Sequence, residues 1–287
     1  MSALSGETSA RTGAGAARVQ AQALREGRLH ASQEWVAEEV AIALEVNGLS
    51  HAVMMATPLD LEDFALGFML SEGLIETRGE LLDVEVEPSE AGITLHMRVL
   101  QRQMHRLKER RRTLAGRTGC GLCGTESLDQ AIRPICATVA RCDVPASAIA
   151  HAMNGLAAMQ DLQRTTGATH AAAWCDLDGV VRYLREDVGR HNALDKLVGA
   201  MARAGEDSAR GFIAVTSRAS YEMVHKTATA GVGLLAAISA PTRLAIDTAQ
   251  RAGLTLAGFA RGRNAVLYTR PARMLLPALP DGVACET

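Results

Sequence analysis

The 287-residue chain is poor in aromatic side chains, which make up 3% of it. Proteins that bind single-stranded nucleic acid stack bases on aromatic rings, so this composition argues against that class. The formal net charge is only −2, which argues against a general polyanion binder but leaves local basic patches open. No apolar run reaches the ~18 residues of a membrane-spanning helix. We therefore expect neither a nucleic-acid partner nor a membrane partner.

Cysteine is too sparse for a disulfide scaffold, because the chain holds six cysteines in 287 residues. This usage is typical of a reducing compartment, so we expect a cytoplasmic protein. The N-terminus is rich in Ala, Gly, Ser and Thr and lacks the apolar stretch of a signal peptide. We expect residues 1–30 to form a disordered tail.

Length and composition suit one large or two ordinary globular domains, with 48% hydrophobic and 22% charged residues. Asn47-Gly48 separates two alternating stretches and is a typical type I′ hairpin turn, since both residues need positive φ. A helix with hydrophobic residues at helical spacing follows, and then two more strands. The expected elements are strands at 40–46 and 51–56, a helix at 59–75, and strands at 82–86 and 93–99. They indicate a small α+β domain over residues 31–115.

After a linker at 116–144, strands alternate with helices over residues 145–275, and a tail follows at 276–287. This alternation is typical of a three-layer α/β domain with parallel strand pairs. The expected helices are 147–162, one that begins near Asp187, one from Ser217 or Ser220 to about Gly231, and 242–252. The expected strands are 170–175, 180–185, 211–216, 234–239, 254–260 and 265–269.

Ligands of such sheets bind beyond the carboxyl ends of the strands, where helix N-termini point. The sequence places three polar clusters there. In the first, Asp187, His191 and Asp195 recur every four residues, so we expect them on one helix face; a capping Asp with a row of surface salt bridges is the alternative.

The other two clusters are rich in hydroxyl and guanidinium donors. Ser217, Arg218 and Ser220 come at a predicted helix start and offer donors to an anion. Arg261 and Arg263 flank Gly262 after a late strand, where they either clamp a phosphate or decorate a hairpin.

The most unusual stretch is a glycine-rich segment that carries Cys120 and Cys123 as a C-x-x-C pair. The basic run 101–117 precedes it, and nearby positive charge favours the reactive thiolate. Three functions compete for the pair: a structural zinc half-site, a thioredoxin-like redox site, and a sulfur relay in which one thiolate carries a persulfide and the other assists its release.

The residues around the pair weigh against the first two functions. Zinc needs two further ligands, and the nearest cysteines, Cys136 and Cys142, have an unusual spacing; we expect both to be structural. A thioredoxin-like pair would open a helix directly after a strand, whereas glycine flanks these thiols. A zinc-dependent deaminase would need H-x-E and P-C-x-x-C, but the two helix starts carry His191-Asn-Ala and a cysteine-free Ser217–Ser220.

Taken together, five blocks resemble the formate dehydrogenase accessory sulfurtransferases, the FdhD/NarQ family. The resemblance extends from about Glu39 to Arg270. The blocks are Gly119-Cys-Gly-Leu-Cys-Gly, Arg185-Glu-Asp-Val-Gly-Arg-His-Asn-Ala-Leu-Asp-Lys, Ser217-Arg-Ala-Ser-Tyr-Glu-Met-Val-His-Lys, Ser239-Ala-Pro-Thr and Gly258-Phe-Ala-Arg.

The resemblance implies a C-terminal cytidine-deaminase-like α/β domain without zinc, no structural metal, and a homodimer. It implies that sulfur passes from a cysteine desulfurase to the molybdenum or tungsten bis-guanine-dinucleotide cofactor (bis-molybdopterin guanine dinucleotide, bis-MGD), which is cargo for the catalytic subunit of formate dehydrogenase. Cys120 would carry the persulfide and Cys123 would help. The residues expected at the cofactor are Phe259, Ala260, Arg261, Gly262, Arg263 and Asn264, with Arg190, His191, Asn192, Ser217, Arg218 and Ser220 at the helix starts.

Two other functions remain open from the residues alone. The chain could be a cofactor-binding chaperone that moves no sulfur, or a C-x-x-C thiol oxidoreductase in which both cysteines matter equally.

Overall fold

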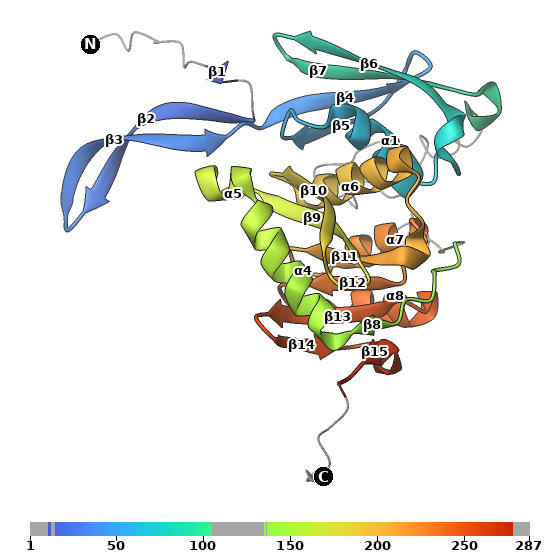
Figure 1. Ribbon diagram of the computed structural model, residues 1–287. Helices are drawn as coiled ribbons and strands as arrows, with labels where there is room; N and C mark the ends of the chain where they lie inside the picture. Colours follow the sequence, from blue (N-terminus) through green and yellow to red (C-terminus); the bar gives the residue numbers. More distant parts are fainter. Residues whose placement is uncertain (1–10, 13–14, 105–134, 136, 278–287) are drawn as a thin grey trace, which may run out of the picture.

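The computed structural model describes residues 11–12, 15–104, 135 and 137–277 (Figure 1). The predicted dithiol at Cys120 and Cys123, most of the basic run, and Cys136 lie outside the described residues. So do residues 278–287 of the predicted C-terminal tail.

A four-stranded sheet, here called the N-terminal sheet, forms the first half of the body. Its order is β5-β4-β7-β6, and α1 packs on its inner face. Asn47 and Gly48 have φ of 47° and 78°, which confirms the predicted turn with two positive φ angles. The elements are β4 Val40–Val46, β5 Leu49–Ala56, α1 Leu61–Ser71, η1 Arg78–Glu80, β6 Leu81–Ser89, β7 Gly92–Val99 and η2 Gln101–Gln103.

A long hairpin replaces much of the expected N-terminal tail. β2 (Ala16–Arg25) pairs with β3 (Arg28–Ala37) along its whole length, and β1 (Arg11–Thr12) pairs with the start of β2. The prediction of disorder up to residue 30 is therefore wrong for residues 16–30. Glu26 and Gly27 form the turn with φ of 50° and 77°, and the side chains of β2 alternate between partly buried and exposed. We call residues 16–37 the arm, which projects to the left in Figure 1.

The second half of the body is a six-stranded sheet of order β10-β9-β11-β12-β13-β14. The pairs β11–β12 and β12–β13 are parallel, as predicted, and the other pairs are antiparallel. Gln160 divides the helix expected at 147–162 into α4 and α5. The strands are β9 His170–Asp176, β10 Val181–Asp187, β11 Gly211–Val215, β12 Leu234–Ala237, β13 Thr255–Arg261 and β14 Asn264–Leu267. The remaining elements are β8 Val144–Pro145, α4 Ala146–Met159, α5 Asp161–Thr166, α6 Arg190–Ala204, η3 Ser208–Arg210, α7 Tyr221–Thr229, α8 Arg243–Ala252, η4 Pro271–Arg273 and β15 Met274–Leu275.

Helices cover both faces of this sheet. α4 packs on one face, against side chains such as Phe212 and Ala236, while α6, α7 and α8 pack on the other, against Trp174 and Leu235. The described part of this half thus has three layers. No helix in the described ranges is long and apolar enough to cross a membrane.

Helices α1 and α6 join the two halves through unusually close backbone contact. A Cβ atom at Gly67 would lie 1.7 Å from the carbonyl oxygen of Asp195, and one at Gly199 would lie 1.9 Å from that of Asp63. Only glycine permits this approach.

Buried ion pairs surround the glycine contact. Lys226 Nζ lies 2.8 Å from Asp195 Oδ1 and donates to Ser71 Oγ at 2.9 Å, with Glu72 Oε1 at 3.1 Å. On the other side, Asp63 accepts hydrogen bonds from two arginines of the second half, Arg185 and Arg203. Polar side chains therefore join the halves alongside the apolar packing of α1 and α6.

Candidate functional site

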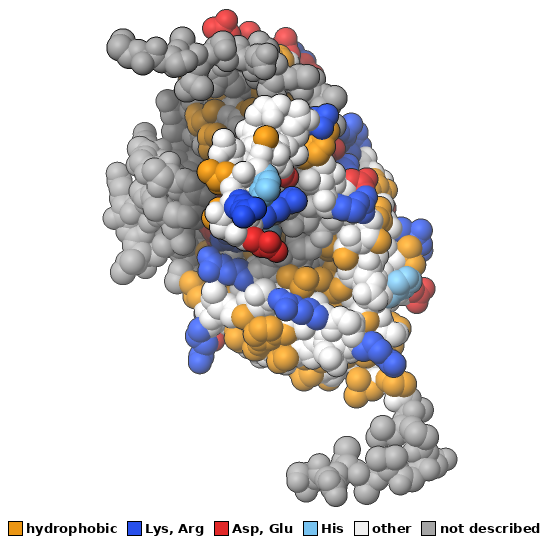
Figure 2. Space-filling view, turned by 90° about the vertical axis from the view of Figure 1, so that its left-hand side faces the viewer, with side chains coloured by type: hydrophobic (Ala, Val, Ile, Leu, Met, Phe, Trp, Pro, Cys, Tyr) orange, Lys and Arg blue, Asp and Glu red, His pale blue; other side chains and the backbone are white. Residues whose placement is uncertain are grey.

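The polar loops predicted to bind a ligand reach one edge of the six-stranded sheet. β10 and β11 both run antiparallel to β9, and β11, β12 and β13 are parallel, so the carboxyl ends of four strands meet there. We call this the carboxyl edge. Figure 2 views the side on which the arm projects; in its lower half, basic side chains are spread among hydrophobic ones and few are acidic.

The loop before α6 is held by a buried carboxylate, that of Asp187. Its Oδ1 accepts from the backbone N of Gly189 at 2.7 Å and from Nδ2 of Asn192 at 3.0 Å. Its Oδ2 accepts from the backbone N of Thr57 at 3.0 Å and lies 2.7 Å from Nζ of Lys196. Lys196 is itself fully buried and donates to the Thr57 carbonyl at 2.9 Å. This cluster fixes the start of α6 against the end of β5.

Asn192 belongs to that cluster and not to the open edge. It is 3% exposed, and its Nδ2 also donates to the Met55 carbonyl at 2.8 Å. The expectation that Asp187, His191 and Asp195 share one helix face is wrong, because α6 begins at Arg190, after Asp187. The three side chains contact different residues: Asp187 contacts Lys196, His191 contacts Glu222, and Asp195 contacts Lys226.

A positive cluster lies at the first turn of α6. His191 Nε2 lies 2.9 Å from Oε2 of Glu222 in α7, and both side chains are mostly buried. Burial lowers the pKa of Arg190, the charge of Arg218 lowers it further, and Glu222 opposes both effects. Burial likewise lowers the pKa of His170 at the start of β9, and the charge of Arg190 adds to that effect. Cations this close together favour a bound anion.

Two buried polar atoms of this cluster lack hydrogen-bond partners among residues 15–104, 135 and 137–277: Nε of Arg190 and Oγ of Ser220. Ser220 precedes α7, but its side chain does not cap the helix. Ser217 differs, because it is 4% exposed and its Oγ donates to the Arg218 carbonyl at 3.0 Å. Nε of Arg190 and Oγ of Ser220 are thus available to a ligand and Arg218 is exposed, whereas Ser217 is engaged by the fold.

The β13–β14 hairpin supplies a second basic group on the carboxyl edge. Arg261 pairs with Asn264 across the turn, and Gly262 adopts φ of 55°. The side chains of Arg261, Arg263 and Asn264 are exposed, and Nε of Arg261 donates to the Ile238 carbonyl at 3.1 Å. Ala260, in contrast, is 1% exposed and packs in the core.

Phe259 presents an aromatic face next to these arginines. It is 46% exposed and has φ of 51°, a left-handed conformation that is uncommon outside glycine. Its backbone N donates to the Ser239 carbonyl at 3.2 Å, which holds the conformation in place. Non-glycine residues in this region are concentrated at ligand-binding positions.

The two basic groups lie at opposite ends of the carboxyl edge. β9, β11 and β12 separate β10, which leads to Arg190, from β13, which leads to Arg261, so these two strands are roughly 19 Å apart at the usual spacing, and Arg218 follows β11 between them. The sequence predicted both groups but not their separation. It assigned no role to Glu222 or His170, which face the first group from other elements.

The described cysteines are buried, and burial raises the pKa of each thiol. Cys142 is buried, its Sγ donates to the Gly211 carbonyl at 3.5 Å, and burial raises its pKa to about 11. Burial raises the pKa of Cys175 to about 12. Cys142 is thus structural, as predicted. No group of three or more His, Cys, Asp or Glu side chains suited to a metal ion occurs within the part of the chain that the structure describes.

Comparison with known proteins agrees with this architecture. The chain is 57% identical over 243 residues to "Sulfur carrier protein FdhD" of Variovorax paradoxus, covering 85% of this chain and 87% of that protein. It is 54% identical over 250 residues to the protein of the same name from Cupriavidus necator, covering 87% of each. The fold is similar to the crystal structure of a putative formate dehydrogenase accessory protein from Desulfotalea psychrophila, with a TM-score of 0.72, 22% identity, and coverage of 91% of this chain and 99% of that one. The model of the FdhD/NarQ family matches residues 37–275, which leaves most of the arm outside the match. The chain belongs to the FdhD/NarQ family.

Proposed function

We propose that this protein accepts sulfur from a cysteine desulfurase as a persulfide on Cys120 and transfers it to the bis-MGD cofactor of formate dehydrogenase. The printed names of the relatives support a sulfur carrier and a formate dehydrogenase accessory role. The structural observation that carries the proposal is that basic groups follow β10, β11 and β13 along the carboxyl edge, which spans roughly 19 Å between β10 and β13. A long dinucleotide cargo with phosphate groups matches that spacing and charge.

The two thiols of Cys120 and Cys123 are sufficient to accept one sulfur atom and to release it once. The Cys120 thiolate attacks the terminal sulfur of the donor persulfide, so a Cys120 persulfide forms and the donor leaves as a thiolate. Cys123 then attacks Sγ of Cys120, so the terminal sulfur leaves as sulfide for the cargo and a Cys120–Cys123 disulfide remains. Two electrons pass from the dithiol to the transferred sulfur, and an external thiol reductant restores the pair.

The residues of the carboxyl edge fit the cargo. Arg190 Nε and Ser220 Oγ are buried donors without partners among the described residues, and Arg218 lies beside them. The N-termini of α6 and α7 add partial positive charge there. At the far end, Arg261 and Arg263 would bind a second phosphate group, and Phe259 would stack on a base.

We further propose that the six-stranded half has the cytidine-deaminase-like arrangement without zinc. Helices on both faces of the sheet support this, and the two helix starts carry His191-Asn-Ala and Ser217 to Ser220 where a deaminase needs its ligands. We propose a cytoplasmic homodimer that serves the catalytic subunit of formate dehydrogenase.

Intact-protein mass spectrometry tests the relay. The protein is incubated with a cysteine desulfurase and cysteine, and wild type is compared with Cys120→Ala and Cys123→Ala. We expect an adduct of about 32 Da on wild type and Cys123→Ala that is absent from Cys120→Ala. An unmodified wild type that still binds cofactor would favour the chaperone, and equal loss of disulfide reductase activity in both variants would favour the oxidoreductase.

Binding of guanosine diphosphate tests the carboxyl edge independently. Because hydrogen bonds to charged groups contribute about 1.5–3 kcal/mol, Arg190→Ala should weaken binding about tenfold or more in calorimetry. Arg210→Ala, at the other edge of the sheet, is the matched control and should bind like wild type. Equal affinity of all three proteins would refute the placement of the phosphate.

A further inference from the structure

His170 opens strand β9 at the carboxyl edge and faces the layer of helix α6. Side chains alternate between the two faces of a strand, so His170, Ala172 and Trp174 share one face. Ala172 and Trp174 pack in one hydrophobic core with Leu194 and Leu197 of α6. β9 runs antiparallel to β10 and β11, so its first residue lies where those two strands end. The imidazole of His170 therefore lies at the carboxyl edge, on the side of α6.

Positive charges act on this imidazole. Burial lowers the pKa of His170 most, and the charges of Arg190 and His191 at the start of α6 lower it further. Arg218 belongs to the same cluster, because its charge acts on Arg190. A hydrogen bond with the backbone of Thr216 raises the pKa of His170 but does not outweigh the other effects. At pH 7 the free protein therefore holds His170 mainly as the neutral imidazole.

The carboxylates around the end of β10 and the start of α6 are engaged by other residues. Asp187 lies opposite His170 across the two strands, but its Oδ2 is 2.7 Å from Nζ of Lys196. Glu186 accepts from two backbone nitrogens at the start of α5. Glu222 in α7 lies 2.9 Å from the other imidazole of the cluster. Among the residues that the structure describes, the charges that act on His170 are thus positive.

A phosphate bound at the positive cluster would reverse this balance. The proposed site places it at Nε of Arg190 and Oγ of Ser220, two buried donors without partners among the described residues. An anion there neutralises the guanidinium that lowers the pKa of His170, and its own charge favours the imidazolium. The imidazolium donates from both ring nitrogens, so it can hold the backbone of Thr216 with one and the phosphate with the other, whereas the neutral ring has a single N–H.

We propose that His170 is a further residue that binds the phosphate of the cargo, and that it does so as the imidazolium ion. This role rests on the position of the cargo in the proposed function. The proton comes from the solvent as the phosphate binds, and it returns to the solvent when the phosphate leaves. Binding of the cargo is therefore coupled to the uptake of a proton, and its release to the loss of one.

The direction of the pH dependence follows from the two protonation states. Below the pKa of the free protein, His170 is protonated with or without phosphate; above the pKa of the complex, it is neutral in both. Between these two values binding takes up a proton, so the affinity falls by up to about tenfold for each pH unit. This window begins below pH 6.5, because the pKa of His170 in the free protein is lower than that value.

Calorimetry with the full-length chain measures this proton. The probe is GDP-mannose, whose two phosphates are esterified and have no proton to lose near neutral pH. Binding is measured at pH 7 in PIPES and in ACES, because the dependence of the enthalpy on the ionisation enthalpy of the buffer gives the number of protons taken up. Wild type should take up a substantial fraction of one proton and His170→Gln none. At pH 6 His170→Gln should bind about tenfold more weakly than wild type or worse, and the difference should vanish at high pH.

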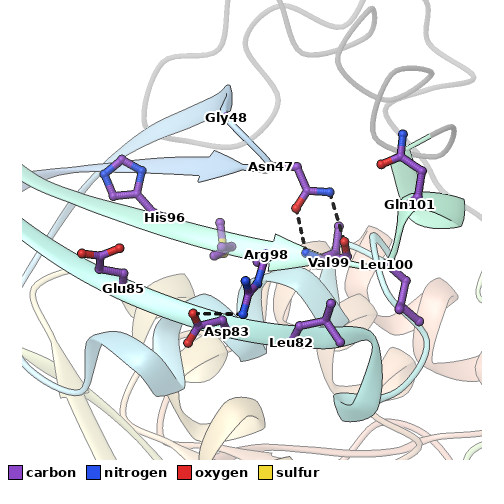
Figure 3. A pocket seen from close by; sticks show the side chains of 11 residues that line it. Asn47, Gly48, Leu82, Asp83, Glu85, His96, Arg98, Val99, Leu100 and Gln101 are labelled. Atoms are coloured by element: carbon purple, nitrogen blue, oxygen red, sulfur yellow. Dashed lines mark hydrogen bonds and ion pairs between the residues drawn. The ribbon is translucent and has the colours of Figure 1, made fainter.

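His96→Gln is the matched control, because it removes an imidazole from the opposite surroundings. His96 lies 3.0 Å from Glu45 and 2.7 Å from Glu87 in the N-terminal sheet. It borders a cavity of about 670 Å³ that Asp83 and Glu85 also line (Figure 3). Carboxylates raise the pKa of this histidine and repel an anion, so the variant should bind GDP-mannose and take up protons like wild type.

NMR of wild type makes the test independent of any substitution. Titration of the His170 ring should give a pKa below 6.5 in the free protein and a higher pKa with GDP-mannose bound. Binding to wild type without proton uptake, or an uptake that persists in His170→Gln, would overturn the role of His170 and leave the phosphate site in place. A wild type that does not bind GDP-mannose would overturn the phosphate site and the role of His170 together.

Discussion

Replacing Lys196 with Met would test how the start of α6 is held. The methylenes of Lys196 fill buried space that Met also fills, but the ammonium group is lost. Asp187 would keep its backbone and Asn192 donors while losing the cation 2.7 Å away. Removing one partner of a buried ion pair costs about 3–5 kcal/mol, so we expect that decrease in the free energy of unfolding.

A second substitution in the same chain separates the charge from the packing. Asp187→Asn removes the buried charge that Lys196→Met leaves unpaired, so the double variant should be more stable than the sum of the single costs predicts. Groups in one buried network couple by about 0.5–3 kcal/mol, and we expect the upper part of that range. Additive costs would show that Lys196 contributes through packing alone.

Urea denaturation followed by circular dichroism measures these free energies, with the m-value as a check on two-state behaviour. The control is Arg182→Met, which breaks the ion pair between Arg182 and Asp176. The side chain of Arg182 is 58% exposed. Exposed pairs contribute about 0–1 kcal/mol, so this variant should be nearly as stable as wild type. A cost below about 1 kcal/mol for Lys196→Met would refute the reasoning, because buried and exposed pairs would then be equivalent.

Three further predictions concern other parts of the molecule. Two glutamates raise the pKa of His96 above its usual 6.5, so its contribution to stability is complete below pH 6.5 and is lost as pH rises through the folded pKa. The variant His96→Gln should therefore show a flatter dependence of the free energy of unfolding on pH. An NMR titration of wild type that gives His96 a pKa of 6.5 or lower would contradict this prediction. With pKa values of about 11 and 12, Cys142 and Cys175 should resist iodoacetamide at pH 7.5 in native protein and react after denaturation, as peptide mapping would show; labelling of the native protein would disprove their burial. Gly67→Ala places a Cβ 1.7 Å from a backbone carbonyl and should lower stability by about 1–3 kcal/mol or more in the same urea assay, whereas Gly79→Ala, which meets nothing within 4 Å, should not.

Local sequence signals predicted most of the elements correctly. The Asn47-Gly48 hairpin and the alternation of strands and helices after Pro145 depend on neighbours in the chain, and the structure confirms both. The sequence did not predict the arm, because the local signals of a hairpin are weak there. Its turn, Glu26-Gly27, is not one of the usual type I′ pairs, and its strands bury too little apolar surface to give a strong alternating pattern.

The sequence predicted the position of some residues of the candidate site correctly and that of others wrongly. Arg190, Arg218 and the arginines at 261 and 263 follow strands, so topology alone brings them to the carboxyl edge. Asn192 follows a strand as well, but its amide is taken up by Asp187 and the Met55 carbonyl, a contact across 137 residues of sequence. No local pattern reports such a contact. Which polar residue serves a ligand and which serves the fold is therefore decided by tertiary partners.

The close junction of α1 and α6 has a consequence for how the chain emerges from the ribosome. Asp63 is separated by 122 residues from Arg185, and Ser71 by 155 residues from Lys226. At about 5–20 residues per second, α1 waits on the order of 10 s for these cations after it has been synthesised. During that wait its glycine face has no α6 against it, and we expect the charged carboxylates of Asp63 and Glu72 to keep that face hydrated. We therefore expect the acidic groups that close the finished fold to disfavour premature association of the nascent chain as well.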